Sequence, residues 1–156
     1  MLTQKEIKSF IKKRKTVSYG NVKVFIPISN NIAIKICENI ENRDNNYFYQ
    51  ELAADHDIGP DVYGTFEIKV NQRTLYGYYT EIVKTFDTYS EFSQKFSEND
   101  IESLENKLES LINYYSADIF YANVGEKDGQ LVCIDFDTKE CYGYHSDKII
   151  SLIQNL

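Results

Sequence analysis

The stretch from Tyr115 to Asp137 limits, more than any other, what this chain of 156 residues can fold into. Asp118 and Asn123 lie five residues apart in a predicted loop after a helix, and Asp135 follows twelve residues later, at the end of an apolar run. Between them, Lys127-Asp128-Gly129 predicts a tight hairpin of two short strands. The hairpin brings three oxygen-bearing side chains to one end, an arrangement that suits a hard divalent cation such as Mg²⁺.

This stretch resembles the catalytic loop and the metal-binding turn of the protein-kinase family. The family pattern is H-R-D-x-x-x-x-N, followed after a hairpin by D-F-G. Here the chain has residues 116–123 and then Asp135-Phe136-Asp137, with the same intervals between the three polar residues. Ser116, Ala117 and Asp137 depart from the pattern. The alternative interpretation of the stretch is an acidic hairpin at a domain surface.

An upstream segment resembles the nucleotide-binding strands of the same family. Ala33-Ile34-Lys35 ends a predicted strand and is similar to the family's Ala-x-Lys, whose lysine holds the nucleotide phosphates. Gly20 and Val22 match the end of G-x-G-x-x-G-x-V, although the earlier glycines are missing. Judged without the resemblance, a lone glycine in a strand more often marks a bulge, and a lysine at a strand end is usually solvated.

The next predicted helix, residues 45–56, supplies a partner for that lysine. Phe48, Leu52 and Ala53 recur at helical spacing and predict its buried face. In the family, a glutamate of this helix pairs with the strand lysine. Glu51, sixteen residues after Lys35, occupies that place in the sequence.

A later strand, predicted at residues 74–83, resembles the strand that enters the hinge between the two kinase lobes. The resemblance places Thr80 at the back of the adenine pocket, with Ala33 among the nucleotide-binding residues. It also implies that Glu81 to Val83 offer groups to the base, so that Glu81 and Val83 are candidate binding residues. The alternative is an ordinary amphipathic edge strand.

The remaining periodicity and turn signals predict a single domain of the α+β class. The resemblance implies a protein-kinase-like fold, in which residues 1–83 form a nucleotide lobe with a five-stranded antiparallel sheet and one αC-type helix, and residues 84–156 form a much reduced helical lobe. Thr3 and Glu6 form a capping box at the start of the first helix. The predicted elements are helices at 3–14, 89–95, from Asp100, and from Ser146, and strands at 17–25, 32–37, 65–70 and 74–83.

Charge and cysteine content narrow the function classes. The net charge is −7, with +5 in residues 1–15 and −12 in the remainder, which argues against general nucleic-acid binding. Three cysteines without C-x-x-C spacing indicate reduced thiols rather than disulfides or a zinc site. No apolar run reaches the length of a membrane span. We therefore expect a cytoplasmic protein, in a host cytoplasm if it is a viral or secreted effector.

The resemblance implies ATP and Mg²⁺ as cofactors and assigns each site residue a role. Lys35, fixed by Glu51, would hold the α- and β-phosphates. Asp135 and Asn123 would bind Mg²⁺, and Asp118 would orient the acceptor hydroxyl and take its proton.

Three functions remain open from the sequence. The first is a minimal Ser/Thr protein kinase, similar to the trimmed kinase effectors of bacterial pathogens and viruses, acting on a protein substrate or needing an activating protein partner. The second is a pseudokinase that binds a protein without transferring phosphate. The third is a small-molecule phosphotransferase, a function with which the sequence of the segment Ile58–Gly64 is compatible.

Overall fold

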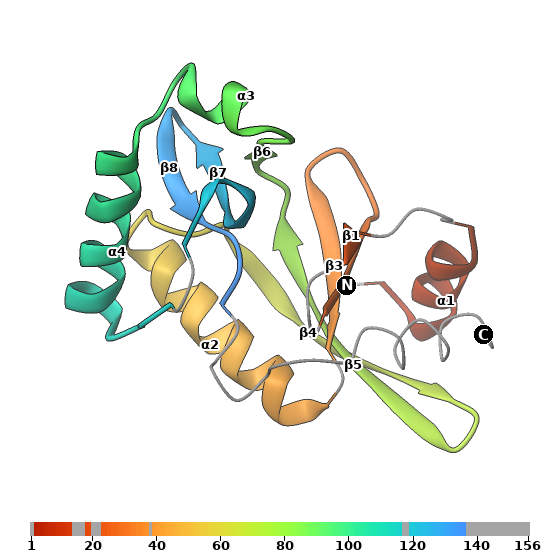
Figure 1. The fold of residues 1–156 in the computed structure, drawn as a ribbon. Coiled ribbons are helices and arrows are strands. Elements are labelled where there is room, and N and C mark those ends of the chain that lie inside the picture. Colours follow the sequence, from red (N-terminus) through yellow and green to blue (C-terminus); the bar gives the residue numbers. More distant parts are fainter. Residues whose placement is uncertain (1, 14–17, 20–22, 38, 117–118, 137–156) are drawn as a thin grey trace.

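A computed structural model describes residues 2–13, 18–19, 23–37, 39–116 and 119–136. The α+β class is confirmed, with four α-helices, one 3₁₀ helix and two antiparallel sheets in this part of the chain (Figure 1). The helices are α1 (Gln4–Lys13), α2 (Ile40–Asp55), α3 (Tyr89–Ser93), α4 (Glu98–Ile112) and the 3₁₀ helix η1 (Tyr121–Asn123). The strands are β1 (Ser18–Tyr19), β2 (Lys23–Pro27), β3 (Ile32–Cys37), β4 (Val62–Val70), β5 (Arg73–Glu81), β6 (Lys84–Thr85), β7 (Val124–Lys127) and β8 (Gln130–Cys133).

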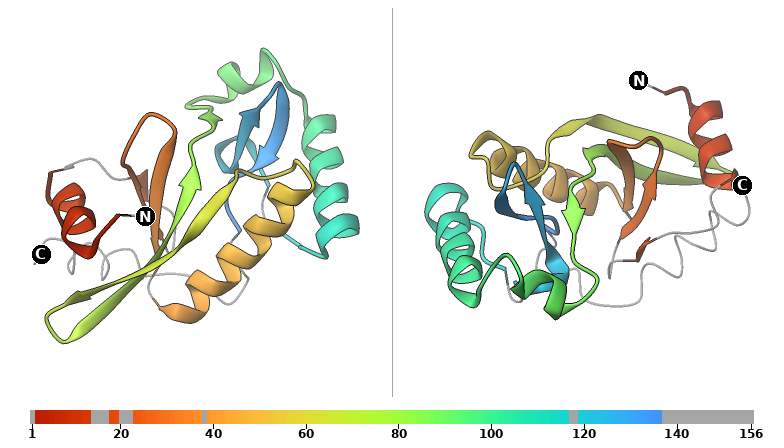
Figure 2. Two further views of the ribbon diagram at one scale, coloured as in Figure 1. Left: turned by 180° about the vertical axis from the view of Figure 1, so that it is seen from behind. Right: turned by 90° about the horizontal axis from the view of Figure 1, so that it is seen from above.

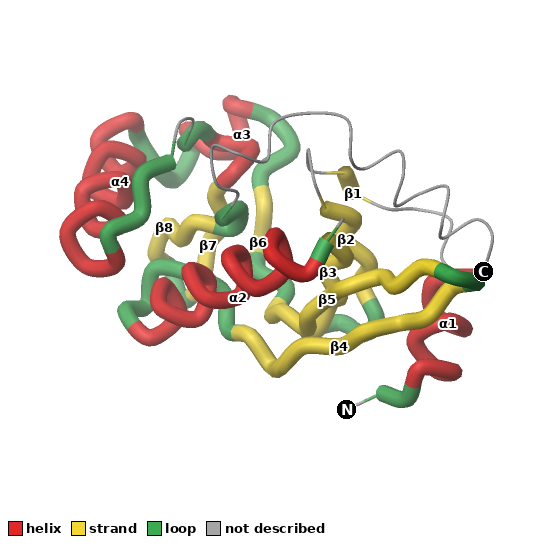
Figure 3. Tube along the Cα trace, turned by 90° about the horizontal axis from the view of Figure 1, so that it is seen from below, coloured by secondary structure: helices red, strands yellow, loops and turns green. Residues whose placement is uncertain are grey.

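The larger sheet is antiparallel and has five strands in the order β1-β2-β3-β5-β4. Side chains alternate along β3, so Ile34 and Ile36 pack with Ile7 and Ile11 of α1 on one face. Lys35 points to the other face, where it contacts α2. The sheet is therefore covered by α1 on one side and by α2 on the other, and α2 lies between α1 and α4 (Figures 1 and 3).

The smaller sheet, β6-β7-β8, lies next to α4 (Figure 2). Its turn at Asp128 and Gly129 has φ values of 52° and 79°, as a tight hairpin of the predicted kind requires. Ile101, Leu104 and Leu108 of α4 pack in one hydrophobic core with residues of both β7 and β8. This core is separate from the one under α1, and it includes Cys133 and Phe136, on either side of Asp135.

Several predicted elements differ in extent, and two of them differ in a way that matters for the site. The strand expected at residues 17–25 is two strands, because β1 pairs antiparallel with β2, Ser18 opposite Phe25. The segment contains Gly20-Asn21, a turn-favouring dipeptide. The helix expected at residues 45–56 begins at Ile40, because the Asn39 side chain caps it by accepting a hydrogen bond from the Asn42 amide at 2.8 Å.

The described part of the chain contains no helix that is both long and apolar enough to cross a membrane.

Candidate functional site

Lys35 lies at the centre of the candidate site. It sits in the middle of β3, opposite Tyr78 of β5, and only 7% of its surface is exposed. Its Nζ atom donates to Oε1 of Gln50 at 3.1 Å and to the carbonyl of Ile134 at 2.8 Å. The ammonium is thus held between α2 and the backbone immediately before Asp135. A solvated lysine at a strand end, the plain alternative, is excluded by these contacts and by the burial.

The helix residue that contacts Lys35 is Gln50, and the prediction of a Lys35–Glu51 ion pair was wrong. Gln50 is fully buried, whereas Glu51 is exposed on the outer side of α2. The cause is the rotation of the helix. Its buried residues are Arg43, Asn46, Gln50 and Ala53, and Phe48, which was expected to face the core, is 53% exposed.

The sequence contains one signal that identifies the buried face of α2, the residue Asn39 that caps the start of the helix. Asn39 fixes the start of the helix, and counting from there places residues 43, 46, 50 and 53 on one face. Three of these four residues are polar, so hydrophobic periodicity selects a different face. Gln50 was missed for that reason.

Thr80 and Ala33, both predicted as nucleotide-binding residues, lie opposite each other in the sheet. They are register partners in β3 and β5 and both are fully buried. The Thr80 hydroxyl accepts from Nε2 of Gln50 at 2.6 Å and donates to the Glu81 carbonyl at 3.2 Å. Val83 lies against the small sheet, since a Cβ on Gly125 would stand 2.6 Å from its Cγ2 atom. Ala33, Thr80 and Val83 thus come from adjoining segments.

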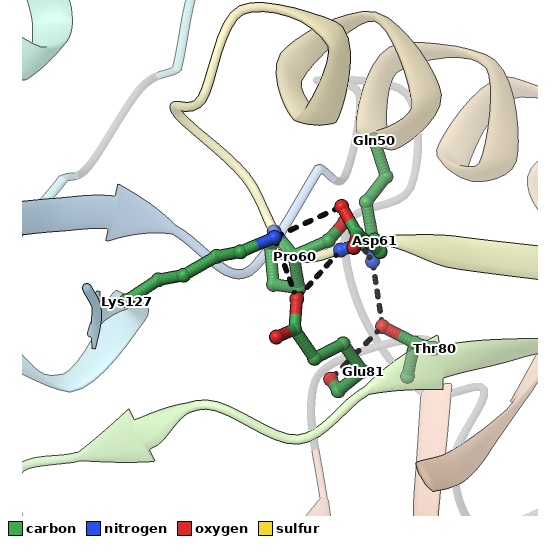
Figure 4. A network of polar contacts seen from close by, with 6 residues as sticks. All are labelled: Gln50, Pro60, Asp61, Thr80, Glu81 and Lys127. Carbon is green, nitrogen blue, oxygen red and sulfur yellow. Dashed lines mark hydrogen bonds and ion pairs between the residues drawn. The ribbon is translucent and has the colours of Figure 1, made fainter. Parts of the chain in front are cut away.

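Glu81 takes part in a charged network that the sequence did not indicate (Figure 4). Lys127 of β7 places Nζ 2.8 Å from Oε2 of Glu81 and 2.9 Å from Oδ1 of Asp61. Burial by itself would lower the pKa of Lys127, but the hydrogen bonds and charges of the two carboxylates outweigh it and raise that pKa above its ordinary value. Nothing in the sequence around Lys127 signals this contact, because the partners lie 46 and more positions away.

The predicted metal-binding pair, Asn123 and Asp135, is brought together by the hairpin between them. The Asn123 carbonyl, at the end of η1, accepts from the Ile134 amide at 3.2 Å. The Asp135 carbonyl lies 3.4 Å from the Tyr114 hydroxyl and 3.3 Å from Sγ of Cys133. These backbone contacts fix the start of the half-buried Asp135 segment beside Lys35.

Other predicted site residues lie outside the described residues: Gly20, Val22 and Asp118, together with Asp137. Among the described residues alone, no group of three His, Cys, Asp or Glu side chains is arranged to hold a metal ion. Asn123 and Asp135 are therefore the part of the proposed metal site whose placement is described.

No protein-family model matches the chain, and no curated protein matches it.

Proposed function

We propose that this protein binds Mg-ATP and transfers a phosphoryl group to a protein hydroxyl, as a minimal protein-kinase-like enzyme. One observation carries the proposal: Nζ of Lys35 donates to the carbonyl of Ile134, 99 positions later in the chain, at 2.8 Å. The contact joins the strand lysine to the segment of Asp135. A phosphate-binding cation and a metal-binding carboxylate must be neighbours in a phosphoryl-transfer site.

The order of the elements supports the same proposal. A five-stranded antiparallel sheet carries Lys35 on the face that α2 covers. After α4, the chain forms η1, the β7–β8 hairpin and then the Asp135 segment. This is the succession that the resemblance to protein kinases implies for a nucleotide lobe followed by a catalytic segment.

The residues present fit the cofactors in the chemistry of their donors. Lys35 would hold the phosphates, while Asp135 and Asn123 offer the carboxylate and amide oxygens that Mg²⁺ prefers. When bound, Mg²⁺ would neutralise charge on the phosphate oxygens. Asp118 would orient the acceptor hydroxyl and accept its proton.

A second function is favoured by one specific observation. Gln50 takes the place in which the family has a carboxylate, and an amide cannot form an ion pair with Lys35. A chain that keeps nucleotide binding but lacks efficient transfer would act as a protein-binding module, a pseudokinase. This alternative shares the nucleotide site and differs in turnover.

Radiolabelled ATP separates the two functions. Wild type and Asp118→Asn are incubated with Mg²⁺ and [γ-³²P]ATP, alone and in cell lysate, and Mg-ATP binding is measured for both by calorimetry. We expect equal binding, with transfer reduced about 10²–10⁴-fold in the variant, because positioned acid–base groups contribute that much. Asp55→Asn, which removes an exposed carboxylate from α2, is the matched control and should transfer like wild type.

Each other result has a definite meaning. If wild type binds Mg-ATP but neither protein transfers phosphate, the binding module is correct. If wild type does not bind Mg-ATP at all, both functions are wrong.

A further inference from the structure

Gln50 makes four hydrogen bonds inside the protein and has no exposed surface. Its Oε1 accepts from Nζ of Lys35 and from the hydroxyl of Tyr78, each at 3.1 Å. Its Nε2 donates to the carbonyl of Pro60 at 3.1 Å and to Oγ1 of Thr80 at 2.6 Å. An amide has two donors and two acceptor positions, so every hydrogen-bonding position of the side chain is used.

The hydrogen-bond partners around position 50 favour an amide over a carboxylate there. The Pro60 carbonyl can only accept, so the atom facing it must donate. An ionised glutamate at position 50 would put a second acceptor opposite that carbonyl, in a buried place where an unsatisfied polar group is costly. The same carboxylate would attract the Lys35 ammonium more strongly than the amide does, in competition with a phosphate.

We propose that Gln50 is the positioning residue for Lys35, and that the neutral amide is required there in place of the family's carboxylate. This inference rests on the proposed nucleotide site and deepens it. The amide aims the ammonium with one hydrogen bond and adds no negative charge to the phosphate-binding side of β3.

The other three hydrogen bonds of Gln50 hold its own position. They reach Tyr78 and Thr80 of β5 and Pro60 in the loop that follows α2. Because α2, the sheet and this loop all meet at one side chain, α2 is fixed against the sheet by contacts that do not involve a nucleotide. Lys35 is therefore held in its place before the nucleotide arrives, and the helix needs no rearrangement on binding.

Three variants test this role: Gln50→Glu, Gln50→Met and, as the matched control, Glu51→Gln. Met has nearly the length of Gln but makes none of the four hydrogen bonds. Glu51→Gln changes the exposed neighbour that the sequence pattern had favoured as the partner of Lys35. Mg-ATP dissociation constants are measured by calorimetry from about pH 5 to about pH 8, a range in which a buried glutamate can titrate. Circular dichroism confirms that each variant is folded under each condition.

At neutral pH we expect both Gln50 variants to bind Mg-ATP roughly tenfold or more weakly than wild type. Gln50→Met loses the hydrogen bond that aims the Lys35 ammonium, and a hydrogen bond to a charged group is among the stronger ones. Gln50→Glu keeps that bond but adds a carboxylate that competes with the phosphate for the ammonium. Glu51→Gln should bind like wild type. As the pH falls, the ratio of the Gln50→Glu constant to the wild-type constant should approach one, since a protonated carboxyl is neutral and can donate to the Pro60 carbonyl. Taking the ratio removes the titration of ATP itself.

Two results would overturn the positioning role while leaving the proposed function intact. One is wild-type affinity in both Gln50 variants. The other is tight binding by Gln50→Glu at neutral pH that weakens on acidification, which would mean that a carboxylate serves Lys35 as well as or better than the amide. A weakened Glu51→Gln would contradict the assignment of the helix face. If wild type itself does not bind Mg-ATP, the proposed function fails first, and the positioning role fails with it.

Discussion

Nζ of Lys127 lies 2.8 Å from Oε2 of Glu81, and this ion pair ties the small sheet to the end of the large one. The two side chains are only 17% and 24% exposed. The amide of Asp61 also donates to Glu81 Oε2 at 3.0 Å, so one carboxylate oxygen joins three segments. A partly buried charge cluster therefore lies at the strand end that, by the resemblance, leads into the hinge between the two lobes.

Lys127→Met should lower the free energy of unfolding by about 1–2 kcal/mol, because the lysine makes charge-assisted bonds that are shielded from water on the Glu81 side, while Asp61 is half exposed. Urea unfolding at neutral pH measures the change. Lys84→Met is the matched control, because Lys84 is an exposed lysine of neighbouring β6 that forms no ion pair within the described part of the chain. A similar loss in both variants would contradict the prediction.

The same pair predicts a pH dependence in the alkaline range. The pKa of Lys127 is raised above 10.5 in the folded protein. The stabilisation that the ion pair of Lys127 provides is therefore complete at a pH below the pKa of this lysine in the unfolded chain. It disappears as the pH rises through the pKa in the folded protein. The difference in unfolding free energy between wild type and Lys127→Met should stay constant across neutral pH and shrink above about pH 10.5. An unchanged difference at strongly alkaline pH would refute this.

Tyr78 and Tyr79 are neighbours on opposite faces of β5 and should respond oppositely to loss of the hydroxyl. Tyr78→Phe removes the bond to Gln50 Oε1 and should cost about 1 kcal/mol. Within the described residues, the Tyr79 hydroxyl is buried and has no hydrogen-bond partner, although the Leu2 backbone lies near it. Tyr79→Phe should therefore be neutral or stabilising by up to about 1 kcal/mol. Thermal unfolding of both variants checks the pair, and a destabilised Tyr79→Phe would be the contrary result.

Local signals in the sequence predicted most of the strands and hairpins. Asp128, at the predicted hairpin turn, and Asn71, between the strands predicted at residues 65–70 and 74–83, have left-handed backbones with φ values of 52° and 56°. The capping box of α1 is formed, with the Thr3 amide donating to Glu6 at 2.7 Å. Such features depend on neighbouring residues only, so a single sequence contains them.

The rotation of α2 could not be read in the same way. Its buried face carries Arg43, Asn46 and Gln50. Arg43 and Gln50 find distant partners in the Phe66 carbonyl and in Lys35 and Thr80, whereas Asn46 donates to the Asn42 carbonyl of its own helix. A helix with a polar buried face has weak hydrophobic periodicity, so Phe48 misled the assignment. Lys35 does lie beside the segment of Asp135, but the helix partner predicted for it, Glu51, was wrong.

Substitution of Gly77, in β5, tests how closely this strand packs behind Lys35, and Gly129, in the β7–β8 turn, serves as the comparison. A Cβ at Gly77 would lie 2.3 Å from Phe66 Cζ and 2.7 Å from the Lys35 carbonyl oxygen. Gly77→Ala must displace the backbone of β3 and should cost about 2–3 kcal/mol. Gly129→Ala meets nothing within 4 Å and is strained only by its φ of 79°, so about 1 kcal/mol is expected. Urea unfolding distinguishes them, and equal costs would show that β5 has room at Gly77.

The last prediction concerns the contact between Lys35 and the Asp135 segment. Mg-ATP at about one hundred times its dissociation constant should stabilise wild type by about 2.7 kcal/mol, seen as a rise in melting temperature. Asp135→Ala should abolish the rise, because the carboxylate that would hold Mg²⁺ is gone. Lys35→Met should reduce the rise, because the ammonium that reaches the Ile134 carbonyl is lost while the metal ligands remain. Asp55→Ala, an exposed carboxylate of α2, should keep the full rise. A wild-type melting temperature unchanged by millimolar Mg-ATP would contradict the nucleotide site, and a full rise in Asp135→Ala would contradict its place in that site.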